Sequence, residues 1–372
     1  MSQKKTIALW YPAFMGGGAE SVALWMLEAL KEDYDVTLFT ITQVDLNRLN
    51  SMYGTQLSEE SVKVRSLSSQ FARPLVHNAI ANNKNFRMLG LHILIRYLKS
   101  QQQHYDLAIS AYNATDLGDR GIQYVHWVNV VEGNAFYQKI SGFSRESLKR
   151  NISIANSHFV AQRAKREYGI ESTIVYPPVV LESPNMSWEE KENAFICSGR
   201  LTKAKEPHRV IQILKRVRQK GFDVKLYLTG GGGGTYAWKY RRFLQKMVDE
   251  NADWVTPYEN LKYQDYINVL CRCRYGIHYK KEPFGISIAE MLKAGSIPFV
   301  RSKGGQVEII GEENQALFFD SVEEAEEKII SVLKDTQKQQ QLLSVLDERK
   351  SLFSTERFMS GVQAVVGDYF ER

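Results

Sequence analysis

Two glutamates, Glu282 and Glu290, flank the start of a helix that the sequence predicts over residues 286–293. Pro283 and Gly285 are typical of a helix start, so Glu282 lies in the preceding loop and Glu290 about one turn inside the helix. An ionised carboxylate only accepts hydrogen bonds and therefore suits paired hydroxyl donors. One carboxylate could bind the hydroxyls of a sugar and the other those of a ribose. The alternative is a charged first turn and a solvated glutamate.

The backbone at the start of this helix could bind an anion. The N–H groups of Phe284, Gly285 and Ile286 are among the donors that a helix leaves unpaired at its N-terminus. The positive end of the helix dipole lies at the same place. A phosphate could therefore lie between the two carboxylates.

Two cations, Arg200 and Lys205, follow the first strand expected in the second half of the chain. Ligands of parallel sheets bind beyond the carboxyl ends of the strands, so both side chains could reach such a ligand. Two cations at this position could neutralise a pyrophosphate. A solvated basic loop is the alternative.

The first half of the chain offers a glycine loop and a histidine. Gly17 and Gly18 stand between a predicted strand and a predicted helix, where glycine lets backbone N–H groups form an anion-binding nest. A tight strand-to-helix turn would need the same glycines. His126 lies at the end of a later strand and could bind a sugar or a leaving phosphate, although a histidine there can also be structural.

The elements that position these residues follow from the alternation of apolar runs and amphipathic stretches, which indicates parallel sheets covered by helices. Two prolines after Tyr176 interrupt the alternation, so we place the domain boundary between Tyr176 and Trp188. The domains then span 1–180 and 190–354, an α/β protein of two doubly wound Rossmann-like domains that face a central cleft. Expected strands are 6–11, 35–40, 106–110, 123–127, 152–156, 194–198, 224–229, 275–279 and 297–300. Expected helices are 19–31, 158–168 with Ser157 as N-cap, 207–219, 236–249 and 286–293, with further helix from 322.

Composition excludes several classes of protein. The chain has 372 residues, of which 44% are hydrophobic and 24% charged. These values exclude collagen, coiled coil, disulfide scaffold and wholesale disorder. The formal net charge is +6, too small to decide between partners. The stretch 139–170 holds seven basic and two acidic residues, which favours an anionic or membrane-borne acceptor over nucleic acid, with a solvated helix face as the alternative.

The cysteines and the apolar runs suggest a compartment. Cys197, Cys271 and Cys273 are sparse and odd in number, which favours a reducing environment and packed thiols over disulfides or a metal site. No apolar run approaches the roughly 18 residues that span a bilayer. We therefore expect a cytoplasmic protein that could rest peripherally on a membrane.

Three familiar motifs are missing. The glycine run 230–234 has Thr235 where the dinucleotide fingerprint requires its third glycine, and no glycine loop continues as a P-loop. No G-x-S-x-G elbow is present, which disfavours an α/β-hydrolase.

In this order, the motifs resemble those of the retaining glycosyltransferases of family 4, which have the GT-B architecture. The likeness runs nearly end to end, and its most specific part is the E-x7-E spacing of Glu282 and Glu290. The chain departs from the family at Glu206, where many members have glycine or another small residue, and in its long glycine run. The matching segments are Gly17-Gly18-Ala19-Glu20, His126, Ala155-Asn156-Ser157, Val175-Tyr176-Pro177-Pro178, Ser198-Gly199-Arg200-Leu201 with Lys205, Ala294-Gly295, Gly304-Gly305 and Glu308.

The resemblance implies a nucleotide-diphosphate sugar bound mainly to the second domain. Arg200, Lys205 and the amides of residues 284–286 would bind the diphosphate, Glu290 the ribose and Glu282 the sugar. Gly17, Gly18 and His126 would close over the reaction centre. The residues of catalysis would then be His126, Arg200, Lys205 and Glu282.

The resemblance also implies the chemistry and the partners. Retention would proceed by front-face attack, with no bound metal, no other cofactor and no side-chain base. A C-terminal helix over 355–372 would pack back on the first domain. We expect a hexose donor, with a preference for GDP-mannose as in mannosyltransferase-like members, and a glycan or lipid-linked acceptor. The alternatives are a nucleotide-sugar 2-epimerase, which needs no acceptor, and a non-catalytic nucleotide-sugar binding protein.

Overall fold

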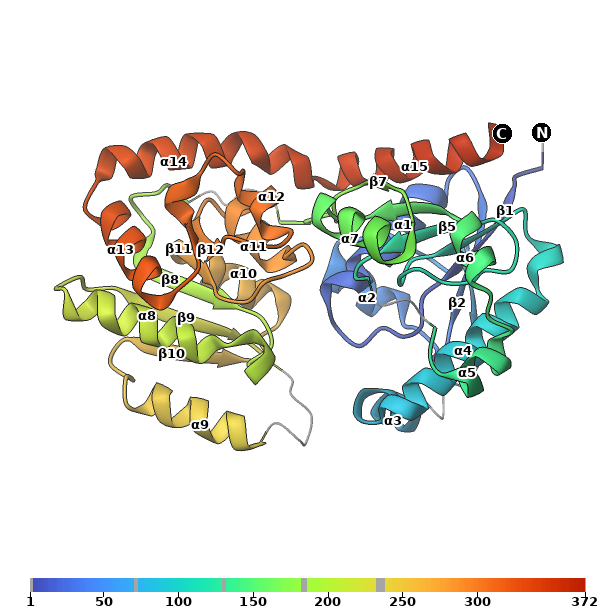
Figure 1. Cartoon of the computed structure of the whole chain (residues 1–372), viewed down its shortest axis with the longest axis horizontal. Helices are drawn as coiled ribbons and strands as arrows, with labels where there is room; N and C mark the ends of the chain where they lie inside the picture. Colours follow the sequence, from blue (N-terminus) through green and yellow to red (C-terminus); the bar gives the residue numbers. More distant parts are fainter. Residues whose placement is uncertain (1–2, 70–72, 129–131, 182–185, 232–237, 372) are drawn as a thin grey trace. The chain divides into compact units, whose positions relative to one another are not determined.

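The computed structural model describes residues 3–69, 73–128, 132–181, 186–231 and 238–371. The chain divides into two compact units (Figure 1). The first comprises Met1–Val180 and Ser354–Arg372, and the second Leu181–Phe353. Within the described residues no helix is both long and apolar enough to cross a membrane. Cys197, Cys271 and Cys273 are buried free thiols, as predicted.

The first unit is built on a parallel sheet of order β3-β2-β1-β4-β5-β6-β7. Its order reverses direction between β1 and β4, so the loops that follow these two strands leave the same edge side by side. The strands are β1 Thr6–Trp10, β2 Asp35–Thr40, β3 Val62–Ser66, β4 Leu107–Ser110, β5 Ile122–Val125, β6 Ile152–Ala155 and β7 Ser172–Ile174. The helices are α1 Gly18–Leu30, α2 Leu46–Tyr53, α3 Arg73–Asn82, α4 Lys84–Ser100, α5 Ala135–Ser141, α6 Arg145–Arg150, α7 His158–Tyr168 and α15 Thr355–Glu371.

The C-terminal helix α15 belongs to the first unit. Its apolar side chains Phe358 and Val362 share a buried core with Val22 of α1. The Gln363 side chain also donates a hydrogen bond to the carbonyl of Ala29, at 2.8 Å. The amphipathic face of α15 therefore completes the core of a unit that begins more than 300 residues earlier in the chain.

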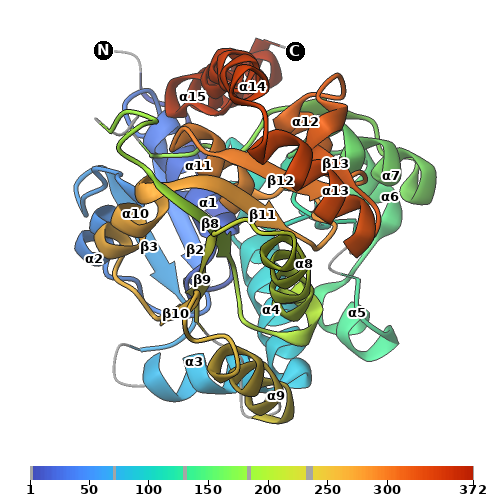
Figure 2. The same cartoon turned by 90° about the vertical axis from the view of Figure 1, so that its left-hand side faces the viewer.

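The second unit is a six-stranded parallel sheet of order β10-β9-β8-β11-β12-β13. Here the order reverses between β8 and β11. Helices α8 and α13 pack together on one face of the sheet, and α11, α12 and α14 pack together on the other (Figure 2). The strands are β8 Glu192–Ser198, β9 Lys225–Gly230, β10 Val255–Glu259, β11 Cys273–His278, β12 Ile297–Arg301 and β13 Phe318–Phe319. The helices are α8 Pro207–Gln219, α9 Trp238–Asp249, α10 Tyr263–Arg272, α11 Ile286–Lys293, α12 Gln306–Ile310, α13 Val322–Leu333 and α14 Thr336–Arg349.

Local sequence explains where several of these helices begin. The Ser157 hydroxyl accepts a hydrogen bond from the N–H of Val160, which confirms the predicted N-cap of α7. Pro207 stands at the first position of α8, where its missing N–H costs nothing. The preceding residue, Glu206, has φ 54° and ψ 40°, a left-handed conformation that glycine adopts more readily. A glycine at this position would therefore adopt the observed backbone without strain.

Candidate functional site

The loops with Arg200, Lys205 and Glu282 leave the second sheet at its switch point. β8 ends at Ser198 and β11 at His278, and these two strands are neighbours at the place where the strand order reverses. Ligands of doubly wound sheets bind in the crevice beyond such a point. The topology therefore positions these motifs together although some 80 residues separate them in the chain.

Lys205 and Glu282 form an ion pair at this point. The Lys205 Nζ lies 2.5 Å from the Glu282 Oε1, and the side chain of Glu282 is only 13% exposed. His278 Nε2 lies 3.0 Å from the same oxygen. Burial raises the pKa of Glu282, but the hydrogen bond with His278 and the charges of His278 and Lys205 outweigh it and lower the pKa overall. Glu282 is thus held ionised, and its Oε2 has no partner among the described residues.

The loop that carries Glu282 is fixed by a second segment. The N–H of Glu282 donates to the Gln306 side chain at 2.8 Å, and the N–H of Gly305 donates to the Glu282 carbonyl at 2.9 Å. A Cβ on Gly305 would lie 2.0 Å from the carbonyl oxygen of Pro283, so only glycine permits this approach. The Gly304-Gly305 motif therefore supports the position of Glu282.

Glu290 is connected to the end of β8 through a tyrosine. Tyr266 of α10 donates from its hydroxyl to the Glu290 Oε2 at 2.7 Å. The same hydroxyl also interacts with Ser198, the last residue of β8. Burial raises the pKa of Glu290 to about 7, although the Tyr266 hydrogen bond acts in the opposite direction. At neutral pH this carboxyl is close to half ionised, and its Oε1 has no described partner.

Arg200 differs from Lys205 because its charge is not paired with any carboxylate in the described part of the chain. The residue is exposed, and its guanidinium has no hydrogen bond or ion pair with a described residue. It follows Gly199, whose φ of 140° favours glycine. A cation that has no described partner, in the same loop after β8 as Lys205, could bind an anionic ligand.

The start of α11 has the expected form. Gly285, with φ 112° and ψ 63°, precedes the first helical residue Ile286. The N–H of Ile288 already donates to the Gly285 carbonyl at 2.9 Å, whereas the N–H groups of Gly285 and Ile286 have no described acceptor and could bind a phosphate. Phe284 is 2% exposed and packs on the Phe353 ring at 5.6 Å, so only its backbone could meet a ligand.

In the first unit, the glycine loop after β1 is tied to a buried carboxyl. Glu20 is 4% exposed, and its Oε1 accepts from the N–H of Met15 at 2.5 Å. Its Oε2 accepts from the Tyr53 hydroxyl at 3.0 Å, and the N–H of Gly17 donates to that hydroxyl at 3.1 Å. Burial raises the pKa of Glu20 to about 7, against the opposing hydrogen bonds from Met15 and Tyr53. Gly18 is the first residue of α1, so the nest and the helix start coincide.

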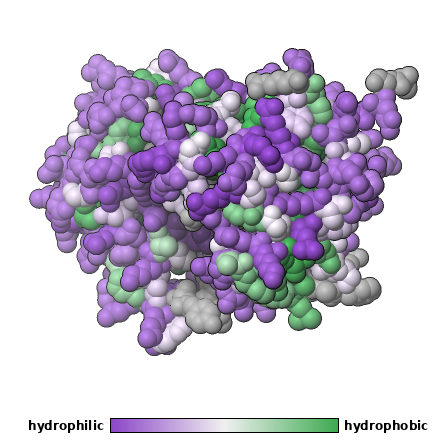
Figure 3. Space-filling view, turned by 45° about the vertical axis from the view of Figure 1, so that its right-hand side comes forward, coloured by the Kyte–Doolittle hydropathy of each residue, from purple (hydrophilic) through white to green (hydrophobic). Residues whose placement is uncertain are grey.

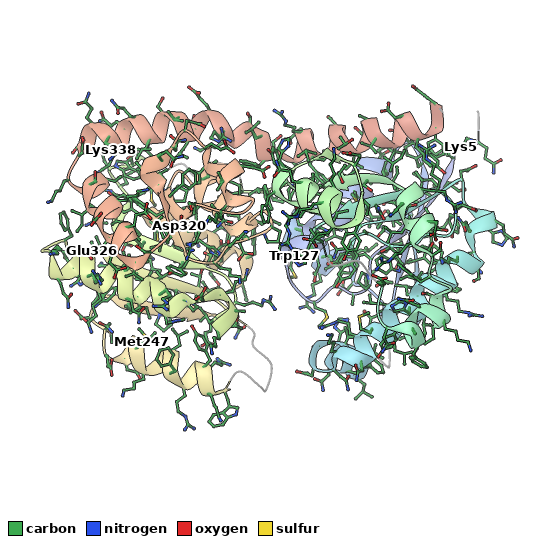
Figure 4. All side chains as sticks on the ribbon, in the orientation of Figure 1. Lys5, Trp127, Met247, Asp320, Glu326 and Lys338 are labelled. Carbon is green, nitrogen blue, oxygen red and sulfur yellow. The ribbon has the colours of Figure 1, made fainter. Side chains whose placement is uncertain are left out.

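His126 lies at the same edge of the first sheet, beyond β5. Its Nε2–H donates to the carbonyl of Ala111 at 2.9 Å, and the Asn113 side-chain oxygen accepts from the N–H groups of His126 and Trp127, both at 2.9 Å. Burial lowers the pKa of His126 to about 4, with a smaller opposing effect of the Ala111 hydrogen bond, so the ring is neutral. Nδ1 has no described partner and is not fully buried, and in this tautomer it accepts a hydrogen bond. The neighbouring Trp127 is labelled in Figure 4. Its ring packs under the Arg163 guanidinium at 4.8 Å.

The structure brings part of the predicted site together. Lys205 contacts Glu282 directly. Glu290 is connected through Tyr266 to Ser198, which ends β8 two residues before Arg200. Gly17, Gly18 and His126 lie in the first unit. The part of the glycine run after residue 231 lies outside the described residues. Within the described ranges, no cluster of three or more His, Cys, Asp or Glu side chains could hold a metal ion.

Sequence reasoning missed three positioning residues. Tyr266 and Asn113 form hydrogen bonds with residues distant in the sequence, and no local sequence pattern predicts such contacts. His278 could have been found, because a histidine that ends an apolar strand four residues before a candidate glutamate is close enough to contact it.

Comparisons with known proteins agree with this geometry. Residues 182–344, which lie in the second unit, match the family model described as glycosyl transferases group 1. No curated protein matches the chain in a sequence search.

Solved structures with the same fold cover nearly the whole chain. The crystal structure of the Anabaena protein HepE with UDP and glucose aligns with a TM-score of 0.71 at 15% identity, covering 98% of this chain and 100% of that one. Sucrose-phosphate synthase from Thermosynechococcus elongatus aligns with a TM-score of 0.73 at 14% identity, covering 99% and 100%. WaaG, a glycosyltransferase involved in lipopolysaccharide biosynthesis, aligns with a TM-score of 0.66 at 14% identity, covering 96% and 99%. The predicted GT-B architecture of two Rossmann-like domains is thereby confirmed.

Proposed function

We propose that the chain, whose second unit matches glycosyl transferases group 1, is a retaining glycosyltransferase that moves a hexose from a nucleotide-diphosphate sugar to a hydroxyl of a glycan or lipid-linked acceptor. The observation that supports this most directly is the group at the switch point of the second sheet. There Arg200, which has no partner among the described residues, lies at the same edge of the sheet as the Lys205–Glu282 pair and the start of α11.

Each part of this group has a proposed ligand. Arg200, Lys205 and the amides at Gly285 and Ile286 bind the diphosphate, because cations and a helix N-terminus both favour phosphate. The Oε2 of Glu282 accepts from a hydroxyl of the hexose. Glu290 accepts from the ribose hydroxyls. The HepE structure contains UDP and glucose, which is consistent with this class of donor.

The proposed reaction breaks the bond between the anomeric carbon and the diphosphate oxygen. The acceptor oxygen forms the new bond on the same face, and its proton passes to the departing phosphate. Arg200 and Lys205 stabilise the charge that develops on the leaving group, and such electrostatic stabilisation commonly contributes more to catalysis than any other single effect. The neutral His126 accepts a hydrogen bond from the sugar at Nδ1. The reaction as written uses no bound metal, and full activity in excess EDTA is the expected result.

A ligand screen identifies the donor. We expect GDP and GDP-mannose to raise the melting temperature more than UDP, ADP or their sugars, because a ligand that binds the folded state stabilises it by mass action. UDP-glucose is the main competitor, given the UDP-glucose complex of HepE.

Turnover with the selected donor then tests the function. We expect Arg200→Ala and Glu290→Ala to lower kcat/KM by about 100-fold or more. Arg209→Ala serves as the matched control because Arg209 is an exposed arginine on α8 outside the group. Near-normal rates for the first two variants would refute the site. A new sugar nucleotide formed from donor alone would indicate the 2-epimerase, and binding without turnover on a broad acceptor panel would indicate a binding protein.

A further inference from the structure

Three helices of the first unit, α3, α4 and α5, expose large apolar side chains. Among the described residues, half of the large hydrophobic side chains that are exposed lie on these helices. They are Leu75 on α3, Phe86 and Ile93 on α4, and Phe136 on α5, with exposed fractions of 76, 40, 42 and 64%. In Figure 3, green side chains gather toward the bottom of the first unit, at the height of these helices in Figure 1.

These side chains share one face. Phe86 and Ile93 stand seven residues apart on α4 and therefore lie on the same side of the helix. The ring of Tyr137 stacks on His92 at 5.5 Å, and its hydroxyl donates to the Asn85 carbonyl at 3.3 Å. These contacts hold α5 against α4 and place Phe136, the neighbour of Tyr137, beside the half of α4 that carries Phe86.

The third helix, α3, packs against α4 and exposes a further large apolar side chain. Val76 and Ile80 of α3 pack in one buried core with Leu91 and Leu94 of α4. Leu75, next to Val76, is 76% exposed and thus lies outside this core. The packed sides of α3 and α4 are therefore apolar, as a core requires, and their exposed sides carry large apolar side chains among polar and basic ones.

The charge on these helices has one sign. Residues 61–105 contain seven lysines and arginines and no aspartate or glutamate, although the whole chain is only +6. Across α3, α4 and α5 the basic residues are Arg73, Lys84, Arg87, Arg96, Lys99 and Lys139. Lys99 pairs with the buried Asp116 at 2.5 Å. Lys84, Arg87 and Lys139 are exposed and make no ion pair with a described residue.

The more obvious basic stretch, 139–170, is largely neutralised beyond Lys139. Arg145 pairs with Glu132 at 2.8 Å, Arg163 with Glu167 at 2.7 Å, and Lys165 with Glu171 at 2.7 Å. Beyond Lys139 only Lys149 and Arg150 make no ion pair with a described residue, so the charge excess of this stretch is mostly that of a solvated helix face.

We propose that the face formed by α3, α4 and α5 binds the surface of an anionic lipid bilayer. Exposed aromatic and aliphatic side chains beside unpaired cations are what an interfacial surface requires, since the apolar groups enter the headgroup region and the cations meet lipid phosphates. A nucleic acid would use the cations but not Leu75 or Ile93. This binding needs neither donor nor turnover, so it stands or falls separately from the proposed function.

Vesicle sedimentation of the full-length chain tests the proposal. We expect binding to vesicles of phosphatidylcholine with 30% phosphatidylglycerol, and at least about tenfold weaker binding to pure phosphatidylcholine or in high salt. The charge variant K84E/R87E/K139E should bind about 100-fold more weakly. The apolar variant F86S/I93S/F136S keeps all the cations. It should also lose binding to the same anionic vesicles at the same salt concentration.

The matched control is K149E/K165E/R166E, which changes the charge of the same unit by the same amount on exposed residues of α6 and α7. It should bind vesicles within about threefold of the unchanged chain. Circular dichroism and donor-induced thermal shift confirm that each variant is folded. Equal loss in the control, full binding by both face variants, or no vesicle binding together with binding to RNA or with self-association would overturn the proposal.

Discussion

At the switch point of the first unit, Glu20 uses both carboxylate oxygens within its own unit, whereas Glu282 and Glu290 of the second unit each keep one oxygen without a described partner. The same contrast holds for the nitrogen groups. His126 donates from its Nε2 to a backbone carbonyl and keeps only Nδ1 without a described partner, whereas the whole guanidinium of Arg200 makes no described contact. The two sheets have the same kind of strand reversal. The switch point of the first unit therefore consists mainly of groups that hydrogen-bond one another. The switch point of the second unit has groups that are left to bind a ligand.

This difference indicates which groups should contribute free energy of ligand binding. A buried polar group that already has its hydrogen bonds contributes shape, and removing it costs mainly stability. A charged group held in place but left without a partner can bind an anion or a hydroxyl at little cost of reorganisation. We therefore expect substitutions at the second reversal to reduce binding and rate. Those at the first should act mainly on stability, apart from substitutions of His126, whose Nδ1 has no described partner.

The largest expected effect comes from exchanging a carboxylate for an amide at both reversals. Glu282→Gln should lower kcat/KM by about 100-fold, because it removes the charge that faces Lys205 and weakens the acceptor for a sugar hydroxyl. Glu20→Gln should lower it less than about tenfold. Steady-state kinetics with the donor selected by thermal shift measure both. Equal losses would erase the contrast between the two units.

A smaller effect concerns pH. Because burial raises the pKa of Glu290 to about 7, the carboxyl is mostly protonated at pH 6 and mostly ionised at pH 8. Only the ionised form accepts from both ribose hydroxyls, so the Kd for the donor should fall about fivefold to tenfold across this range. Calorimetric titration of Glu290→Gln should show a flat profile. A profile that persists in this variant would assign the titration to another group.

A substitution of Tyr266 tests whether Glu290 is the group that titrates. The Tyr266→Phe variant loses the hydroxyl that stabilises the ionised form of Glu290, so the pKa of Glu290 should rise further above its usual range. At pH 7 donor binding should weaken about threefold to fivefold, and the midpoint of the pH profile should move to higher pH. Tyr263→Phe, one turn earlier on α10, serves as the control and should leave the midpoint in place.

The smallest effect is on stability at Glu206. Its left-handed backbone favours glycine, so Glu206→Gly should raise the free energy of unfolding by about 0.5–1 kcal/mol and leave kcat unchanged. Glu206→Ala should bring no such gain, since alanine also disfavours positive φ. Urea denaturation followed by circular dichroism measures both variants. A gain in alanine as large as in glycine would show that the glutamate side chain, rather than its backbone, is responsible.

Much of the α/β alternation could be predicted from the sequence. The ranges 207–219 and 286–293 agree with α8 and α11, and 35–40 agrees with β2, because each has a clear period and a clear boundary residue. The region from α2 to α4 received no prediction. β13, with two residues, is too short for a periodic signal, and the exposed side of α4 carries apolar residues where an amphipathic pattern needs polar ones.

The residues of the candidate site could likewise be predicted only in part. The carboxylates, cations and glycines were predicted by type and spacing, and the structure brings Lys205 into contact with Glu282. The residues that set their ionisation were not predicted. Tyr266 lies 24 positions from Glu290, and which loops meet depends on strand order, which a single sequence does not state.

The central claim is that the unpartnered charge of the second unit binds a diphosphate. The most direct measurement is calorimetric titration of the nucleoside diphosphate and the corresponding monophosphate into the unchanged chain and into Arg200→Ala. We predict that the diphosphate binds at least about tenfold more tightly than the monophosphate, and that Arg200→Ala removes most of this difference. Equal affinities for the two nucleotides, or a preference that survives the loss of Arg200, would contradict the account.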